Sequence, residues 1–170
     1  MPFMTPKQRA YRREANRVWN VKTGATRSGK TYGDYFLLPR RLMDGRGLPG
    51  LNVLLGSTRG TLARNLIEPM QSIYGPALVS DICSNNTAVL FGETCHCLGA
   101  ENIRQVNHLR GSSIKYCYGD EVATWNPEVF EMLKSRLDKA YSRFDGTCNP
   151  EGPTHWFKKF LDKGGPELYQ

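Results

Sequence analysis

The stretch VKTGATRSGKTYG, from Val21 to Gly33, decides the fold. Within it, Gly24 to Thr31 read GATRSGKT, which matches the pattern G-x-x-x-x-G-K-[ST] in full and places Arg27 in the middle of the loop. A phosphate group needs several backbone N–H donors that converge on it, and glycines allow a tight loop to aim them beneath a helix N-terminus. Because the match follows a predicted strand and opens a predicted helix, it indicates a phosphate site rather than a fortuitous glycine turn.

Each residue of this loop is a candidate nucleotide contact. The predicted contacts are Gly24, Ala25, Thr26, Arg27, Ser28, Gly29, Lys30 and Thr31. In such a loop the lysine reaches the β- and γ-phosphates, and the hydroxyl that follows it binds magnesium. Lys30 is therefore predicted to be catalytic and Thr31 to be a metal ligand.

A second motif, IKYCYGDE at Ile114 to Glu121, supplies the carboxylates that nucleotide hydrolysis requires. Ile114 to Tyr118 reads as a mostly apolar strand, and the two acidic residues follow at its carboxyl end, where ligands bind in open α/β sheets. Asp120 suits the magnesium shell, and Glu121 suits the base that orients or deprotonates the attacking water. Alone, an apolar strand that ends in Asp-Glu is more often an ordinary strand end, so this interpretation depends on the loop.

The adjacent glutamate favours an ATPase that carries its own catalytic carboxylate. An Asn-Lys-x-Asp motif, which would favour a GTPase, is absent from the sequence. The motifs do not exclude a small-molecule kinase, although such enzymes seldom need so basic a surface.

Strand and helix patterns alternate along the chain and predict an α/β fold, with a mostly parallel sheet flanked by helices. The predicted strands are 18–23, 52–56, 87–91, 94–98, 114–118 and 142–147, and the predicted helices are 30–43, 61–74, 127–137 and 154–161. The strands 87–91 and 94–98 form a predicted hairpin across Gly92-Glu93. With its two motifs, the chain is predicted to be a P-loop NTPase of the type with an additional strand and a catalytic glutamate (ASCE).

The charge suggests a polyanionic partner. The 170 residues carry a formal net charge of +7, and basic residues gather at 7–17, at 40–46 and at Lys158, Lys159 and Lys163. Such clusters gain affinity for nucleic acid by displacing counterions from phosphates. No run of residues approaches the length of a membrane span, so we expect a cytoplasmic protein with no membrane partner.

Together these motifs resemble the N-terminal ATPase domain of the large terminase subunit, the DNA-packaging motor of tailed bacteriophages. The resemblance runs from about Thr5 to Phe160 and rests on TPKQRAY, GATRSGKT, LRGSSIKYCYGDE and TCNPEGPTHWF. It implies that Gln8 reads adenine with Arg9 or Tyr11 beside the base. It also implies that Arg27 contacts phosphate in cis.

The resemblance assigns roles to two further segments. Arg110 is implied to be the arginine finger that a neighbouring active site receives, and such fingers raise rates by about 10³ to 10⁵ where they are assigned. Thr147 and Asn149 are implied to form a coupling motif that reads the γ-phosphate.

Simpler interpretations stay open for these residues. Gln8 also fits as a solvated residue on a basic helix, and Arg110 as a surface arginine. Thr147 and Asn149 also fit as caps of a turn before Pro150. Arg59 and Arg64 are candidates for contact with DNA or with a neighbouring subunit, and the sequence does not decide between these.

For the whole chain, 1–170, the resemblance implies one Mg²⁺-dependent ATPase domain that uses ATP to move double-stranded DNA into a procapsid in the host cytoplasm. Implied partners are other copies in a ring, the portal protein and the small terminase subunit. We expect the domain to be truncated at its C-terminus and to lack the nuclease domain and its activity. The alternatives are a helicase or translocase core of another P-loop lineage and a nucleotide-regulated DNA-binding module without turnover.

Overall fold

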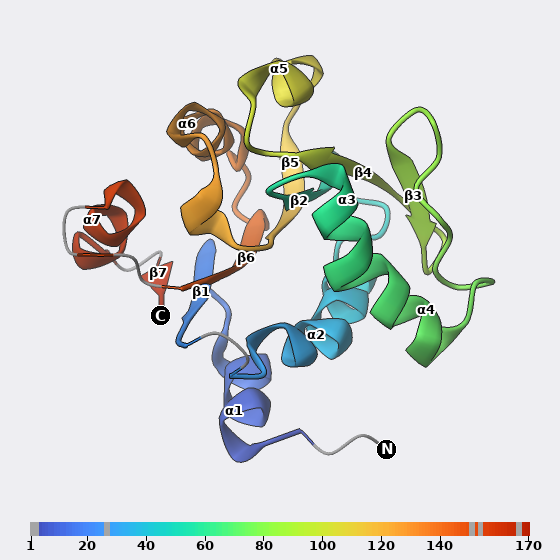
Figure 1. Ribbon diagram of the computed structural model, residues 1–170, viewed down its shortest axis with the longest axis horizontal. Helices are drawn as coiled ribbons and strands as arrows, with labels where there is room; N and C mark the ends of the chain where they lie inside the picture. The colour runs from blue at the N-terminus through green and yellow to red at the C-terminus, as the bar shows by residue number, and fades with distance from the viewer. Residues whose placement is uncertain (1–3, 26–27, 150–151, 153–154, 166–167) are drawn as a thin grey trace.

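The computed structural model describes residues 4–25, 28–149, 152, 155–165 and 168–170. A seven-stranded sheet with the order β3-β4-β2-β5-β6-β1-β7 runs through the molecule (Figure 1). The strands are β1 (Trp19–Thr23), β2 (Leu51–Gly56), β3 (Thr87–Leu90), β4 (Glu93–Gly99), β5 (Ile114–Gly119), β6 (Arg143–Cys148) and β7 (Leu168–Tyr169). All neighbouring strands pair in parallel except β3 and β4. The predicted α/β fold with a mostly parallel sheet is confirmed.

The strand order places β6 between β1, which leads into the glycine loop, and β5, which carries the acidic motif. Thr23 lies beside Cys148 in the β1–β6 register, and Gly119 lies beside Gly146 in the β5–β6 register. The predicted additional strand is therefore present. Because parallel strands end at the same edge, the loop, the acidic residues and the end of β6 meet at one side of the sheet.

Helices cover both faces of the sheet (Figure 1). They are α1 (Pro6–Glu14), α2 (Lys30–Asp44), α3 (Arg59–Leu62), α4 (Glu68–Tyr74), α5 (Ile103–Val106), α6 (Pro127–Arg136) and α7 (Trp156–Asp162). The central strands are apolar on both sides, as buried parallel strands require. Val53 and Leu55 of β2 share a core with Phe130 of α6, whereas Leu54 of β2 shares the opposite core with Leu38 of α2. None of the described helices is long and apolar enough to cross a membrane.

The predicted helix 61–74 is divided into three pieces. Between α3 and α4 the chain forms a π-helical turn, Ala63–Ile67. Pro69 accounts for the interruption because proline has no N–H to donate to the carbonyl four residues earlier, which is that of Asn65, and its ring crowds that carbonyl.

Two further expectations need correction. The hairpin turn lies at Phe91 and Gly92, one residue earlier than predicted, and both residues have positive φ (53° and 81°). Such paired left-handed residues match the twist of a two-residue hairpin. The last predicted strand is 142–147, yet Leu168–Tyr169 also forms a strand and pairs with β1 as the edge strand β7. Two residues are too few to show a strand period.

Candidate active site

The glycine loop joins β1 to the first turn of α2. Gly29 has φ 77° and forms the N-cap of α2, so Lys30 is the first residue of that helix. Only glycine adopts this left-handed conformation without a steric cost. Gly24 has φ 155°, and a Cβ there would lie 3.2 Å from the Ser28 hydroxyl oxygen. The loop backbone thus directs the N-terminus of a 15-residue helix toward the site, and the positive end of that helix favours an anion.

Lys30 connects the loop with the end of β6. Its ammonium group donates to the carbonyl oxygens of Gly24 and Ala25, both at 2.7 Å, and to Asn149 Oδ1 at 2.9 Å. Burial lowers the pKa of Lys30 from its ordinary value, and the nearby negative charge of Glu121 opposes that shift. The cation is therefore held between the two segments that the motifs singled out.

Asp120 follows β5 and is buried, with 3% of its surface exposed. Its carboxylate accepts two hydrogen bonds, from Asn65 Nδ2 at 2.8 Å to Oδ2 and from the Thr147 hydroxyl at 3.2 Å to Oδ1. Burial raises the pKa of Asp120, whereas the two donors lower it. The carboxylate is thus oriented by neutral groups while it faces the same cavity as Lys30.

Glu121 occupies the left-handed region, with φ 49° and ψ 51°. This conformation is uncommon for a residue with a side chain, and strained residues of this kind gather at functional sites. The Thr124 N–H and hydroxyl both donate to the Glu121 carbonyl, at 2.9 Å and 2.7 Å, which holds the conformation in place. Burial and the neighbouring Asp120 raise the pKa of the Glu121 side chain, and Lys30 opposes that shift.

Thr147 links the two acidic residues. Its hydroxyl donates to Asp120 and accepts from the backbone N–H of Glu121 at 3.2 Å. One buried hydroxyl on β6 therefore fixes the relation between the end of β5 and the strand beside it. A nucleotide contact for Thr147 or Asn149 stays a prediction.

A cavity of about 200 Å³ unites these groups. Its lining residues come from α2, the π-helical turn, and the ends of β5 and β6: Lys30, Thr31, Asn65, Asp120, Glu121, Thr147, Cys148 and Asn149. Six of these were predicted from the motifs, and the other two, Asn65 and Cys148, were not. Cys148 lies between two motif residues, and burial raises its pKa to about 11, so the thiol stays protonated near neutral pH.

Gln8 lies beside the loop and makes structural contacts. Its Nε2 donates to the Gly29 carbonyl at 2.8 Å, and its Oε1 accepts from the Thr5 N–H at 2.8 Å, which completes a capping box for α1. Beside it, Arg9 is exposed, and the Tyr11 hydroxyl is 3.4 Å from Asp145 Oδ1. Adenine contact by Gln8 stays a prediction, and the visible role of the residue is to dock α1 on the loop.

Among the described residues, the predicted finger Arg110 does not line the cavity. Arg110 is exposed and follows the 3-10 turn Asn107–Leu109, ahead of β5. This placement leaves its side chain accessible to a neighbouring molecule, and its role as a finger stays a prediction. Thr26 and Arg27 lie outside the described residues, as does Pro150 of the coupling motif.

An ion pair lies beneath the loop and gives a prediction for stability. Lys22 on β1 pairs with Asp34 on α2, and Lys22 also lies 4.3 Å from the centre of the Tyr11 ring. Asp34 is 1% exposed, and burial, against the opposing charge of Lys22, raises its pKa to about 6.

We predict that Asp34 makes stability fall between about pH 4, where an exposed aspartate titrates, and pH 6. In this window the folded state retains a proton that the unfolded state has lost, so the free energy of unfolding decreases as pH rises. Urea unfolding of the wild-type chain and of Asp34→Asn at pH 4 and pH 7 measures the effect. The unfolding free energy of the wild-type chain, relative to that of Asp34→Asn, should decrease by up to about 3 kcal/mol as the pH rises through this window. Two parallel pH profiles would contradict the prediction.

Comparisons with known proteins identify similar structures. No known family model and no curated protein matches the sequence. The large terminase of a thermophilic bacteriophage is 25% identical, with a TM-score of 0.80, over 99% of this chain and 45% of the phage protein. The ADP complex of the same phage protein matches at 25% identity with a TM-score of 0.79, over 98% of this chain and 44% of the other. The chain therefore spans less than half of that large terminase.

The likeness extends to an isolated ATPase domain. The large terminase ATPase domain of Thermus phage P74-26 is 16% identical, with a TM-score of 0.66, over 96% of this chain and 71% of that domain. The identity is low, but the fold is shared over nearly the whole chain. Together with the motifs at one edge of the sheet, these matches show that this chain shares its fold with bacteriophage large terminase ATPase domains.

Proposed function

We propose that this chain hydrolyses ATP to drive double-stranded DNA into a viral procapsid. The observation that carries the proposal is the convergence of Lys30, Thr31, Asp120 and Glu121 on one cavity beside the glycine loop. A phosphate loop alone supports nucleotide binding, and a carboxylate that faces the same cavity adds the base that hydrolysis needs. The likeness to large terminases, one of them in complex with ADP, supports the same conclusion.

The donor groups fit Mg²⁺. Thr31 and Asp120 provide a hydroxyl and a carboxylate, both hard oxygen ligands, on the wall of one cavity. The described residues contain no group of three or more His, Cys, Asp or Glu that could hold a metal by themselves. Mg²⁺ usually binds through one or two carboxylates together with substrate phosphates and water, so a small protein ligand set agrees with this ion. When bound, it would neutralise developing charge on the phosphates.

In the proposed mechanism the loop residues bind and orient the phosphates of ATP. Lys30 exchanges its carbonyl partners on the loop for the β- and γ-phosphate oxygens and stabilises the charge that develops there. Arg27 is proposed to act beside it. Glu121 orients the attacking water and accepts its proton, and its fixed backbone limits the positions that the carboxylate can reach. Gln8 supports the loop and is proposed to contact the adenine.

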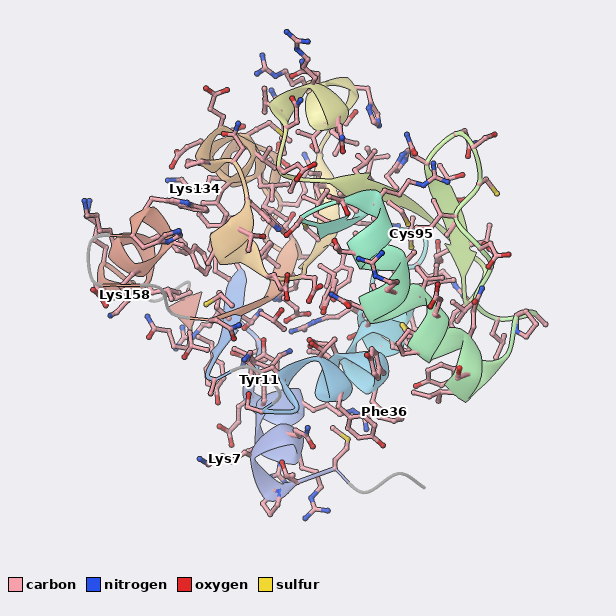
Figure 2. The ribbon with its side chains drawn as sticks, in the orientation of Figure 1. Lys7, Tyr11, Phe36, Cys95, Lys134 and Lys158 are labelled. Carbon is pink, nitrogen blue, oxygen red and sulfur yellow. The ribbon has the colours of Figure 1, made fainter. Side chains whose placement is uncertain are left out.

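Coupling to DNA is proposed to pass through the end of β6. Lys30 already contacts Asn149, so a phosphate that attracts Lys30 changes the contacts of that segment. Basic residues occur at more than one part of the periphery: Figure 2 shows Lys7 on α1 at the bottom of the molecule and Lys158 on α7 at its left edge. The proposed partners are double-stranded DNA held mostly by its phosphates, other copies of the chain in a ring, the portal protein and the small terminase subunit. Assembly would take place in the host cytoplasm.

The steady-state ATPase rate of the purified chain, measured against protein concentration, tests the proposal. We expect a rate per molecule that rises with concentration, because a neighbouring copy completes the site, and that vanishes in Glu121→Ala. Tight ATP binding without turnover at any concentration would contradict it and favour a nucleotide-regulated DNA-binding module. Separation of DNA strands would favour a helicase instead.

A mixing experiment tests Arg110. Lys30→Ala removes the phosphate contact but leaves Arg110 in place, and Arg110→Ala does the reverse. If Arg110 acts on a neighbour, mixtures of the two inactive variants should regain part of the wild-type rate, because some sites then combine an intact loop with an intact arginine. Mixtures that stay as inactive as the separate variants would count against a finger between subunits.

A further inference from the structure

Asn65, outside the motifs, contacts the acidic centre directly. It lies in the π-helical turn Ala63–Ile67, is half-buried and lines the cavity with Lys30 and Thr31. Its Nδ2 donates to Asp120 Oδ2 at 2.8 Å. It therefore connects a helix on one face of the sheet with the proposed metal ligand.

The turn around Asn65 fixes the residue from its backbone as well. Pro69 has no N–H to donate to the Asn65 carbonyl, and the Tyr35 hydroxyl of α2 donates to that carbonyl instead, at 2.8 Å. The Glu68 N–H donates to the Ala63 carbonyl, five residues earlier, which widens the turn. Wide turns of this kind are rare and occur frequently at functional sites. The helix thus loses one regular bond, and Asn65 is instead held to the helix that begins at Lys30.

The chemistry of the contacts indicates what Asn65 does for Asp120. Each carboxylate oxygen accepts from one neutral donor, Oδ1 from Thr147 and Oδ2 from Asn65. A lysine or arginine in this position would offset the negative charge, whereas an amide orients the carboxylate and leaves its charge available to a cation. Residues that hydrogen-bond to a metal ligand and orient it, without binding the metal themselves, contribute strongly to metal affinity.

We propose that Asn65 is a positioning residue that orients the Asp120 carboxylate for the Mg²⁺–nucleotide complex. The inference rests on the proposed function, because it takes Asp120 as a metal ligand. Asn65 has no part in the reaction itself, and it acts through Asp120. A purely structural role would tie the π-helical turn to the sheet and would leave metal affinity unchanged.

Binding of Mn²⁺, followed by electron paramagnetic resonance in the presence of saturating ADP, tests the proposal. Asn65→Leu has a similar volume and no donor, and we expect its Kd for Mn²⁺ to rise by about 10- to 100-fold. The matched control is Gln71→Leu on α4, where Nε2 donates to the exposed Asp81 carboxylate at 2.8 Å, away from the cavity. This control removes the same kind of bond from the same helical segment and should keep the wild-type Kd.

Affinity for ADP in the presence of EDTA, together with the melting temperature, gives the second readout. The metal-free ADP affinity should match the wild-type value in Asn65→Leu, because the proposed role concerns only the metal. The melting temperature should fall, because the buried Asp120 carboxylate loses a donor, but it should stay above the assay temperature. Asn65→Ala removes the donor without placing a large apolar side chain at the cavity wall. It should weaken Mn²⁺ binding to the same extent as Asn65→Leu. Agreement between the two variants would show that the loss does not come from a folding defect caused by leucine.

The outcomes separate the inference from the function on which it rests. If the wild-type chain binds no Mn²⁺ with ADP, the proposed function and the inference both fail. If the wild-type chain binds it and both Asn65 variants bind it equally well, the inference alone is overturned. Loss of metal-free ADP affinity in parallel with Mn²⁺ affinity would also overturn the inference, since it would show a structural role.

Discussion

Lys30→Ala is expected to remove measurable ATP hydrolysis, with a loss of at least about 10³-fold in rate. Loss of a single preorganised donor costs about 10² to 10³ in rate, and Lys30 also carries a full charge that the triphosphate requires. Among the described loop residues, Lys30 alone is a cation. Its ammonium group bridges the Gly24 carbonyl and Asn149 Oδ1, so the substitution also breaks the contact between the loop and β6. The measurement is single-turnover hydrolysis with saturating ATP, together with equilibrium ATP binding.

The controls distinguish this effect from a damaged fold. Lys30→Met keeps the length of the side chain without its charge and should be as inactive as Lys30→Ala. Lys134→Ala removes an exposed lysine that pairs with Glu131 on α6, away from the cavity, and should keep the wild-type rate. Full turnover in Lys30→Ala would mean that the cavity beside Lys30 is not the hydrolytic site.

The sequence predicts the part of this site that depends on local rules. A glycine at positive φ followed by a helix with Lys30 as its first residue needs only the loop pattern, and apolar runs between turn residues locate the central strands. Both acidic residues could be placed because the carboxyl ends of parallel strands share one edge. For these reasons the predicted bounds of the main strands and helices agree with the structure to within one or two residues.

The contacts that the sequence did not predict depend on distant neighbours. Asn65 reaches Asp120 from 55 positions away, and no motif joins them. Pro69 was the available signal, because a proline inside a predicted helix frees the carbonyl four residues earlier. Gln8 is the reverse case, because a motif predicts its role but its contacts in the fold are different. Its amide group donates to the Gly29 carbonyl of the loop and accepts from the Thr5 N–H at the start of its own helix.

Glu121 is positioned by its backbone to a degree that sequence patterns do not reveal. A left-handed conformation at a residue with a side chain costs about 1–3 kcal/mol, and the structure keeps it through the Thr124 donors on the Glu121 carbonyl and the Thr147 hydroxyl that accepts from the Glu121 N–H. We infer that this strain is retained because it directs the Glu121 carboxylate to one position at the edge of the cavity. Glutamine at this position has the same length and the same backbone strain as glutamate, but its amide cannot accept a proton. The substitution therefore removes the base and keeps the geometry.

We therefore expect Glu121→Gln to bind ATP with wild-type affinity and to cleave it about 10² to 10⁴ times more slowly. The amide can still contact the attacking water but cannot accept its proton, so binding and cleavage should separate. Equilibrium binding of ATP and single-turnover hydrolysis, measured on the same preparation, provide the two numbers. Equal losses in both would indicate misfolding rather than a lost base. A variant that retains the wild-type cleavage rate would place the base elsewhere, and the strained backbone at Glu121 would then need another explanation.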